Sequence, residues 1–139
     1  MKIRTANEAD FPVLRMIYLE SRRKSFHWAD IEEMTLQDFD RHTEGEHIIL
    51  AEADSHILGF ASLYLPDSFI HNLFVHPDFF GRGAGGLLLN ASIEIMNKPL
   101  RLKCVSANQR AMKFYENKGW RRVVEEGNPG QKYWVMEYK

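Results

Sequence analysis

A cluster of glycines follows a strand-like stretch, and its spacing suits the binding of phosphate groups. Residues 69–75 are apolar enough for a buried strand, and Pro77 stops that strand. The glycines that come next are Gly81, Gly83, Gly85 and Gly86. Without side chains they leave backbone N–H groups accessible at the positive N-terminal end of the apolar helix that follows. The sequence therefore predicts a pyrophosphate-binding loop at this point.

Three kinds of phosphate-binding loop compete for this segment. A dinucleotide loop requires glycines directly after a strand and a carboxylate ending the next strand. Residues 77–80 separate the strand from the glycines, and the strand expected at 100–105 has no carboxylate. A nucleoside triphosphate loop requires Lys-Ser or Lys-Thr after the glycines, and neither follows. The third kind is a coenzyme A loop.

The segment resembles the main motif of the GCN5-related N-acetyltransferase (GNAT) superfamily. That motif is a strand ending in Val-x-Pro, then Gln or Arg, two variable residues, Gly, a variable residue, and Gly or Ala. This chain has Val75-His76-Pro77 and then Phe80-Gly81-Arg82-Gly83-Ala84-Gly85. A second family motif matches at Asn108, Ala111, Phe114-Tyr115 and Gly119-Trp120. The likeness extends over nearly the whole chain, but Phe80 replaces the usual Gln or Arg.

The resemblance implies a fold and an activity. The fold would be α/β, a single N-acetyltransferase domain over residues 1–139 with a mixed, mostly antiparallel sheet flanked by helices. The activity would be acetyl-CoA-dependent transfer of an acetyl group to a primary amine, by direct attack in a ternary complex. The acceptor would be a small-molecule amine, slightly preferred, or a protein amine. A non-catalytic acyl-CoA-binding sensor and a pyridine-nucleotide enzyme remain as alternatives.

The resemblance also implies which residues bind the coenzyme. Backbone groups of Leu73, Phe74 and Val75 would bind the pantetheine and polarise the thioester. Asn108 would contact the coenzyme while also capping the following helix. The pyrophosphate would lie on the loop formed by Gly81, Arg82, Gly83, Ala84, Gly85 and Gly86.

Acyl transfer to an amine needs an acid for the leaving thiolate and a base for the amine. Tyr115 stands where the family places a phenol near the sulfur, although it could equally be a half-buried helix tyrosine. Where many members have a glutamate on the strand before the loop, this chain has Ser68 and Phe69. His71 follows on the same face as Phe69. Arylalkylamine acetyltransferases resemble this arrangement, and histidine titrates near neutrality. The alternative for His71 is a structural or substrate hydrogen bond.

The family binds its acceptor under the segment between the first two helices. Here that segment carries Phe26, Trp28 and Glu33. Aromatic rings with a carboxylate suit a cationic amine, through cation–π contact and charge pairing. The alternative is that Phe26 and Trp28 only fill the edge of the core. We expect His76 to be solvated and Cys104 to be an inert core thiol.

The elements that must position these residues alternate between helices and strands. Alternating or apolar runs predict strands at 2–5, 47–53, 57–65, 69–75, 100–105, 120–124 and 133–138. Helical spacing and capping residues predict helices after Asp10, after Thr35, and over 87–96 and 109–118. This order indicates a single α/β domain with a mixed sheet.

Composition excludes several classes of function. The chain has 139 residues, a net charge of −1 and one cysteine. Near-neutral charge gives no electrostatic basis for binding nucleic acid or an anionic membrane. One cysteine excludes an internal disulfide framework and suits a reducing compartment. The start lacks an apolar segment typical of a signal peptide, so we expect a cytoplasmic protein. Separately, we expect no metal and a homodimer.

Overall fold

The computed structural model describes residues 1–26 and 31–139 and contains a seven-stranded sheet with the order β1-β2-β3-β4-β5-β7-β6. The strands are β1 (Lys2–Thr5), β2 (His47–Ala53), β3 (His56–Tyr64), β4 (Phe69–Val75), β5 (Leu100–Val105), β6 (Arg121–Glu126) and β7 (Tyr133–Tyr138). Neighbouring strands are antiparallel except β4 and β5, which pair in parallel. The expected mixed, mostly antiparallel sheet is confirmed.

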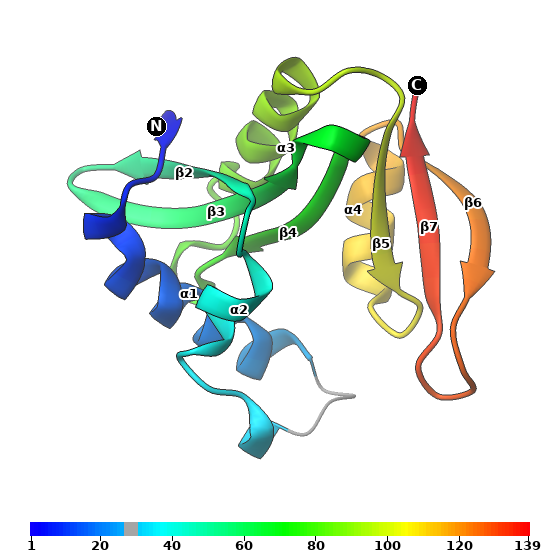
Figure 1. The fold of residues 1–139 in the computed structure, drawn as a ribbon, viewed down its shortest axis with the longest axis horizontal. Helices are drawn as coiled ribbons and strands as arrows, with labels where there is room; N and C mark the ends of the chain where they lie inside the picture. The colour runs from blue at the N-terminus through cyan, green and yellow to red at the C-terminus, as the bar shows by residue number, and fades with distance from the viewer. Residues whose placement is uncertain (27–30) are drawn as a thin grey trace.

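Helices cover both faces of this sheet (Figure 1). The helices are α1 (Phe11–Ser25), α2 (Asp38–His42), α3 (Ala84–Ile95) and α4 (Gln109–Asn117). The α1 and α2 helices pack on one face around buried Leu14, Phe39 and Phe60. The α3 and α4 helices contribute Leu88 and Met112 to the core on the other face. Each face therefore has its own apolar core, as a layered α/β structure requires.

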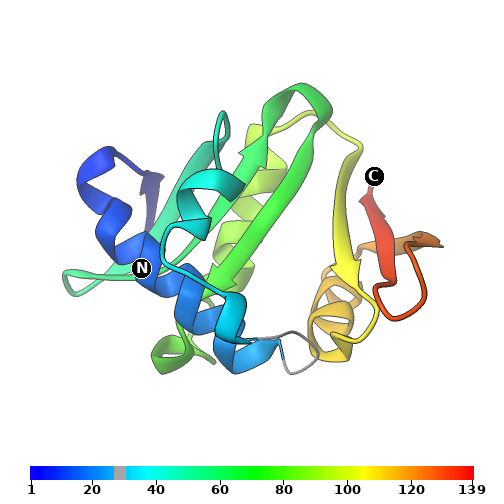
Figure 2. The same ribbon diagram turned by 60° about the horizontal axis from the view of Figure 1, so that its bottom comes forward.

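The sheet divides between β4 and β5. These strands pair only through Phe69 with Arg101 and Ile70 with Leu102, after which they separate (Figure 2). The β4 strand also carries a bulge, because the pairing with β3 passes from Ile70 to Asn72 and leaves His71 without an opposite residue. Bulges redirect side chains and interrupt pairing. From His71 onward, the edge of β4 that faces β5 pairs with no strand among the described residues.

One helix starts where the sequence predicts and another starts later. The α1 helix begins directly after Asp10, although Asn7 caps a short 3-10 turn before it and Asp10 completes that capping box with its side chain. The next helix begins at Asp38, not Thr35, because the Asp38 carboxylate accepts hydrogen bonds from the Thr35 backbone and hydroxyl at 3.0 Å. Both carboxylates are engaged by arginines, Asp10 by Arg4 and Asp38 by Arg22.

Candidate active site

A cavity of about 900 Å³ opens where β4 and β5 separate. Its walls come from the end of α1, the second half of β4, the glycine loop with the start of α3, and α4. The expected site residues in its lining are Phe26, Leu73, Phe74, Val75, Gly81, Gly83, Ala84, Gly85, Gly86, Asn108 and Tyr115. Its described lining includes Lys24 and Arg110 but no carboxylate. The cavity therefore suits an anion.

The glycine loop presents unused hydrogen-bond donors to this cavity. Gly81 and Gly83 have φ of +80° and +86°, a conformation that favours glycine, and Gly83 forms the N-cap of α3. Among the described residues, no backbone acceptor pairs with the N–H groups from Gly83 to Gly86. The positive end of the α3 dipole points the same way. These groups can bind phosphate oxygens.

Several cations surround the loop. The Lys118 amine lies 3.3 Å from the place that a Cβ atom on Gly86 would occupy. The Arg82 guanidinium lies over the Phe79 ring at 5.3 Å, although Arg82 itself is outside the cavity lining. Within residues 1–26 and 31–139, neither cation forms an ion pair with a carboxylate. Their charge is therefore available to an anionic ligand.

The end of β4 is held in place by α1. The Ser21 hydroxyl donates to the carbonyl of Val75 at 3.0 Å. The Phe74 ring packs against Tyr18 at 5.2 Å and against Phe26 at 5.8 Å. These contacts fix the strand whose unpaired edge borders the cavity.

Tyr115 reaches the cavity from the last turn of α4. Its ring packs edge-on against Phe114 at 5.3 Å and Trp120 at 6.1 Å. Burial raises the pKa of the Tyr115 phenol well above its usual value, so it holds its proton at neutral pH. Asn108 caps the same helix, accepting from the Ala111 N–H at 3.2 Å. The Tyr115 phenol and the N-terminus of α4 therefore border the same cavity.

His71 lies at the bulge, two residues before Leu73. Its Nδ1 is 2.8 Å from Oε2 of Glu46, which directly precedes β2. The Glu46 side chain is 9% exposed, and its Oε1 is buried without a hydrogen-bond partner among the described residues. His71 packs beside Phe69 at 6.2 Å between ring centres, as expected from a shared face. It does not line the cavity, which begins at Leu73.

Other histidines have structural partners. The Tyr18 hydroxyl and Nδ1 of His42 share a hydrogen bond of 2.6 Å, and burial raises the pKa of Tyr18 to about 12. The expectation that His76 is solvated is wrong. Its side chain is only 16% exposed, pairs with Glu20, and accepts from the Asp78 N–H at 3.1 Å. Those contacts fix the turn that leads into the glycine loop.

The acceptor residues expected from sequence are only partly brought together. Phe26 lines the cavity, but Glu33 does not. Trp28 lies outside the described residues. Cys104 is buried, and burial raises its pKa to about 11, as expected of an unreactive core thiol.

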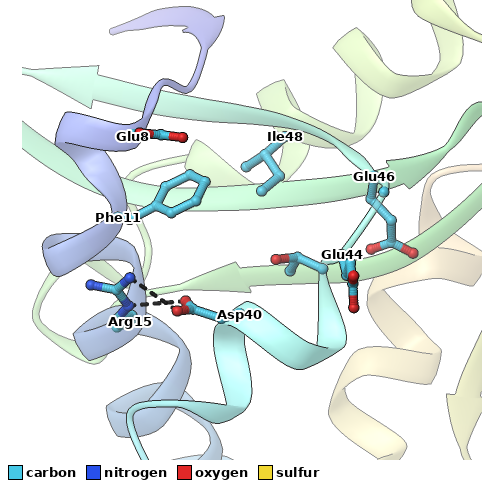
Figure 3. A pocket seen from close by; sticks show the side chains of 9 residues that line it. Glu8, Phe11, Arg15, Asp40, Glu44, Glu46 and Ile48 are labelled. Carbon is cyan, nitrogen blue, oxygen red and sulfur yellow. Dashed lines mark hydrogen bonds and ion pairs between the residues drawn. The ribbon is translucent and has the colours of Figure 1, made fainter.

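A smaller hollow of about 540 Å³ lies between α1, α2 and β2 (Figure 3). Arg15 and Asp40 pair across it at 2.9 Å. Glu46 stands at the side of the hollow opposite that pair. Sequence reasoning did not single out Glu46, because its contact with His71 joins residues 25 positions apart and leaves no local pattern.

Fold and site together define an acyl-coenzyme-binding class of α/β protein. The acetyltransferase (GNAT) family matches residues 11–120, and the chain belongs to this family. The expectations of the family and of an acyltransferase are thus confirmed, and the pyridine-nucleotide alternative is excluded.

Similar proteins carry the same description. An N-acetyltransferase of Archaeoglobus fulgidus is 27% identical over 92% of this chain and 98% of its own length. The PaiA N-acetyltransferase of Thermoplasma acidophilum, solved with coenzyme A, superposes with a TM-score of 0.83 at 21% identity, covering 99% of this chain and 98% of that one. The ribosomal-protein-S18-alanine N-acetyltransferase of Escherichia coli has a TM-score of 0.73 at 19% identity, covering 98% and 91%.

Two further features bear on function. In the described ranges, no helix is long and apolar enough to span a membrane. The same ranges contain no group of three or more His, Cys, Asp or Glu side chains placed to hold a metal ion.

Proposed function

We propose that residues 1–139 form one N-acetyltransferase domain that transfers an acetyl group from acetyl-CoA to a primary amine by direct attack in a ternary complex. The observation that carries this proposal is the cavity that joins the unpaired N–H groups of the glycine loop to the Tyr115 phenol. A donor-lined and cation-flanked cavity, with no carboxylate in its described lining, fits the phosphates of coenzyme A. A phenol in the same lining fits the sulfur.

Bound acetyl-CoA supplies an activated thioester, whose C–S bond breaks as the C–N bond to the amine forms. The loop N–H groups from Gly83 to Gly86 bind its pyrophosphate. The unpaired edge of β4 at Leu73, Phe74 and Val75 takes the pantetheine amides and donates to the thioester oxygen. The Tyr115 phenol, which lines the cavity, gives its proton to the departing sulfur.

The amine must lose a proton during the reaction, and we assign that proton to Nε2 of His71. The Glu46 carboxylate accepts from Nδ1–H, which leaves the Nε2 lone pair available. His71 lies two residues before Leu73, about 7 Å along the strand. In this proposal Nε2 takes the proton of an amine placed beside the thioester, either directly or through one water.

The acceptor in this proposal is a small primary amine in preference to a protein amine. Support comes from the aromatic rings of Phe26 and Phe74, which bound the cavity on the α1 side. Glu33 lies outside the cavity lining and has no part in the proposal. The expected homodimer stays a prediction, which the molar mass from light scattering tests.

Release of free thiol from acetyl-CoA in the presence of a panel of small amines tests this function. We expect amine-dependent thiol release and a matching mass increase of about 42 Da on one amine, which is the mass of an acetyl group replacing hydrogen. In His71→Gln, kcat/KM for the amine should fall while acetyl-CoA affinity is retained. Tight acetyl-CoA binding without thiol release from any amine or N-terminal peptide would contradict the proposal.

A further inference from the structure

We propose that Arg110, held by the ring of Phe80, binds the diphosphate of the coenzyme from the α4 side of the cavity. The proposal deepens the assignment of acetyl-CoA to this cavity and rests on it. It concerns the position at which this chain departs from the GNAT motif, because Phe80 cannot donate a hydrogen bond to phosphate.

Phe80 and Arg110 form a pair in the lining of the cavity. The centre of the Arg110 guanidinium lies 5.2 Å from the centre of the Phe80 ring, within the range of a cation–π contact. Both residues line the cavity. Phe80 directly precedes the loop, and Arg110 lies in the first turn of α4. The ring therefore fixes a flexible arginine next to the loop.

The charge of Arg110 is not used within the described protein. In the described ranges, no carboxylate forms an ion pair with Arg110, whereas Arg101, Arg121 and Arg122 each pair with a glutamate. An unpaired guanidinium beside the unpaired N–H groups of the loop suits one anion between them. Guanidinium offers several donors in a plane and matches phosphate oxygens in pairs.

The placement favours the diphosphate over the 3′-phosphate of coenzyme A. The Phe80 ring ties the guanidinium to the residue before Gly81, at the entrance to the loop whose N–H groups take the diphosphate. A guanidinium from α4 thereby performs the task that a side chain of the loop itself would otherwise perform. Arg110 then compensates for Phe80, which replaces the usual Gln or Arg of the family.

Calorimetric titration with coenzyme A and with dephospho-coenzyme A, which lacks the 3′-phosphate, tests the proposal. Arg110→Gln should weaken the binding of both ligands by the same factor, about tenfold, because one charge-assisted contact is lost. The matched control is Lys113→Gln, an exposed cation of the same helix outside the cavity lining, which should bind within about twofold of wild type. Thermal unfolding should be unchanged in both variants.

Two further variants test the role of the ring. Phe80→Leu keeps an apolar side chain but removes the π face, and it should weaken binding only while Arg110 is present. Phe80→Arg in the Arg110→Gln background returns a guanidinium to the loop and should restore most of the lost affinity. Additive losses from Phe80→Leu and Arg110→Gln would mean that the ring does not hold the arginine, and would overturn the pairing.

Other outcomes separate this inference from the function on which it rests. Unchanged affinity in Arg110→Gln, with normal binding by the wild type, overturns the inference alone. A loss seen with coenzyme A but not with dephospho-coenzyme A assigns Arg110 to the 3′-phosphate and also overturns it. Absence of binding by the wild-type protein would instead contradict the assignment of coenzyme A to the cavity.

Discussion

The carboxylate of Glu46 lies 2.8 Å from Nδ1 of His71 and joins the start of β2 to the bulge of β4. Because a carboxylate only accepts, the imidazole nitrogen facing it carries the hydrogen. The other nitrogen is then left as an acceptor. The same carboxylate stabilises the imidazolium that forms if Nε2 takes a proton. The contact thus gives His71 both a fixed tautomer and a fixed orientation.

Glu46→Gln should lower kcat/KM for the acceptor amine about 10- to 100-fold, as the loss of a group that orients an imidazole does elsewhere. The amide can donate to Nδ1 and so favours the wrong tautomer. Affinity for acetyl-CoA should not change, because Glu46 does not line the cavity. Initial rates and calorimetry measure the two effects. Glu44→Gln, an exposed neighbour, is the control and should leave both quantities at wild-type values.

Tyr115→Phe removes a hydroxyl and little volume. If the phenol protonates the thiolate, kcat should fall by about 10²-fold or more while acetyl-CoA binding is retained. The raised pKa of Tyr115 adds a pH signature, since the phenol stays protonated through its usual titration range near pH 10. Stopped-flow thiol detection measures kcat. Wild-type turnover by the variant would assign the proton to another group or to water.

Alanine substitutions at two glycines should distinguish an effect on the free energy of unfolding from an effect on coenzyme A affinity. Gly83 and Gly45 both have positive φ, +86° and +76°, and open space where a Cβ atom would lie, so alanine at either should cost about 1–2 kcal/mol of unfolding free energy. Only Gly83→Ala should also weaken coenzyme A binding, because Gly45 lies outside the coenzyme cavity. Urea unfolding and calorimetry measure the two quantities. Equal coenzyme A affinities in Gly83→Ala and Gly45→Ala would mean that the loop does not bind the coenzyme.

Gly85→Ala is the complementary case. Its Cβ would meet Phe114 at 3.5 Å, an ordinary contact, and alanine favours a helix by up to about 1 kcal/mol over glycine. Stability should therefore hold or rise. Coenzyme A affinity should fall, because the added methyl group occupies the lining where α3 faces β4. Thermal unfolding with and without coenzyme A measures both effects on one sample.

His42 should make stability depend on pH below neutrality. Burial lowers the pKa of His42, so the folded protein holds fewer protons there than the unfolded chain. The unfolding free energy from this group is fully present above the unfolded pKa of about 6.5 and is lost as pH falls through and below it. Urea unfolding at a series of pH values should give a shallower decline in His42→Gln, whose carbonyl can still accept from Tyr18. An identical change of unfolding free energy with pH in the wild type and in His42→Gln would exclude His42 as the cause of the pH dependence.

Local sequence signals predicted the strands near the site. Residues 69–75 and 100–105 carry apolar and β-branched side chains between clear turn residues, and both ranges match β4 and β5. The glycine spacing predicted the loop, although α3 begins at Ala84 and not at Leu87, because small residues can already form its first turn. The proposed roles of the residues in the cavity stay predictions.

Contacts between distant segments could not be predicted in this way. Glu46 meets His71, and Glu20 meets His76, only after the sheet and α1 have formed. Arg110 meets Phe80 only because α4 packs beside the loop. Each pair depends on how two elements are placed, and no periodicity or motif within either element encodes that placement.

The separation of β4 from β5 has a consequence for handling the protein. Beyond Ile70 and Leu102, neither strand pairs with another described strand along its inner edge, and unpaired edges are where sheets recruit strands from other chains. A coenzyme whose pantetheine amides occupy that gap would cover these unpaired strand edges for as long as it stays bound. Protein stripped of coenzyme should therefore aggregate sooner on storage than protein kept with it.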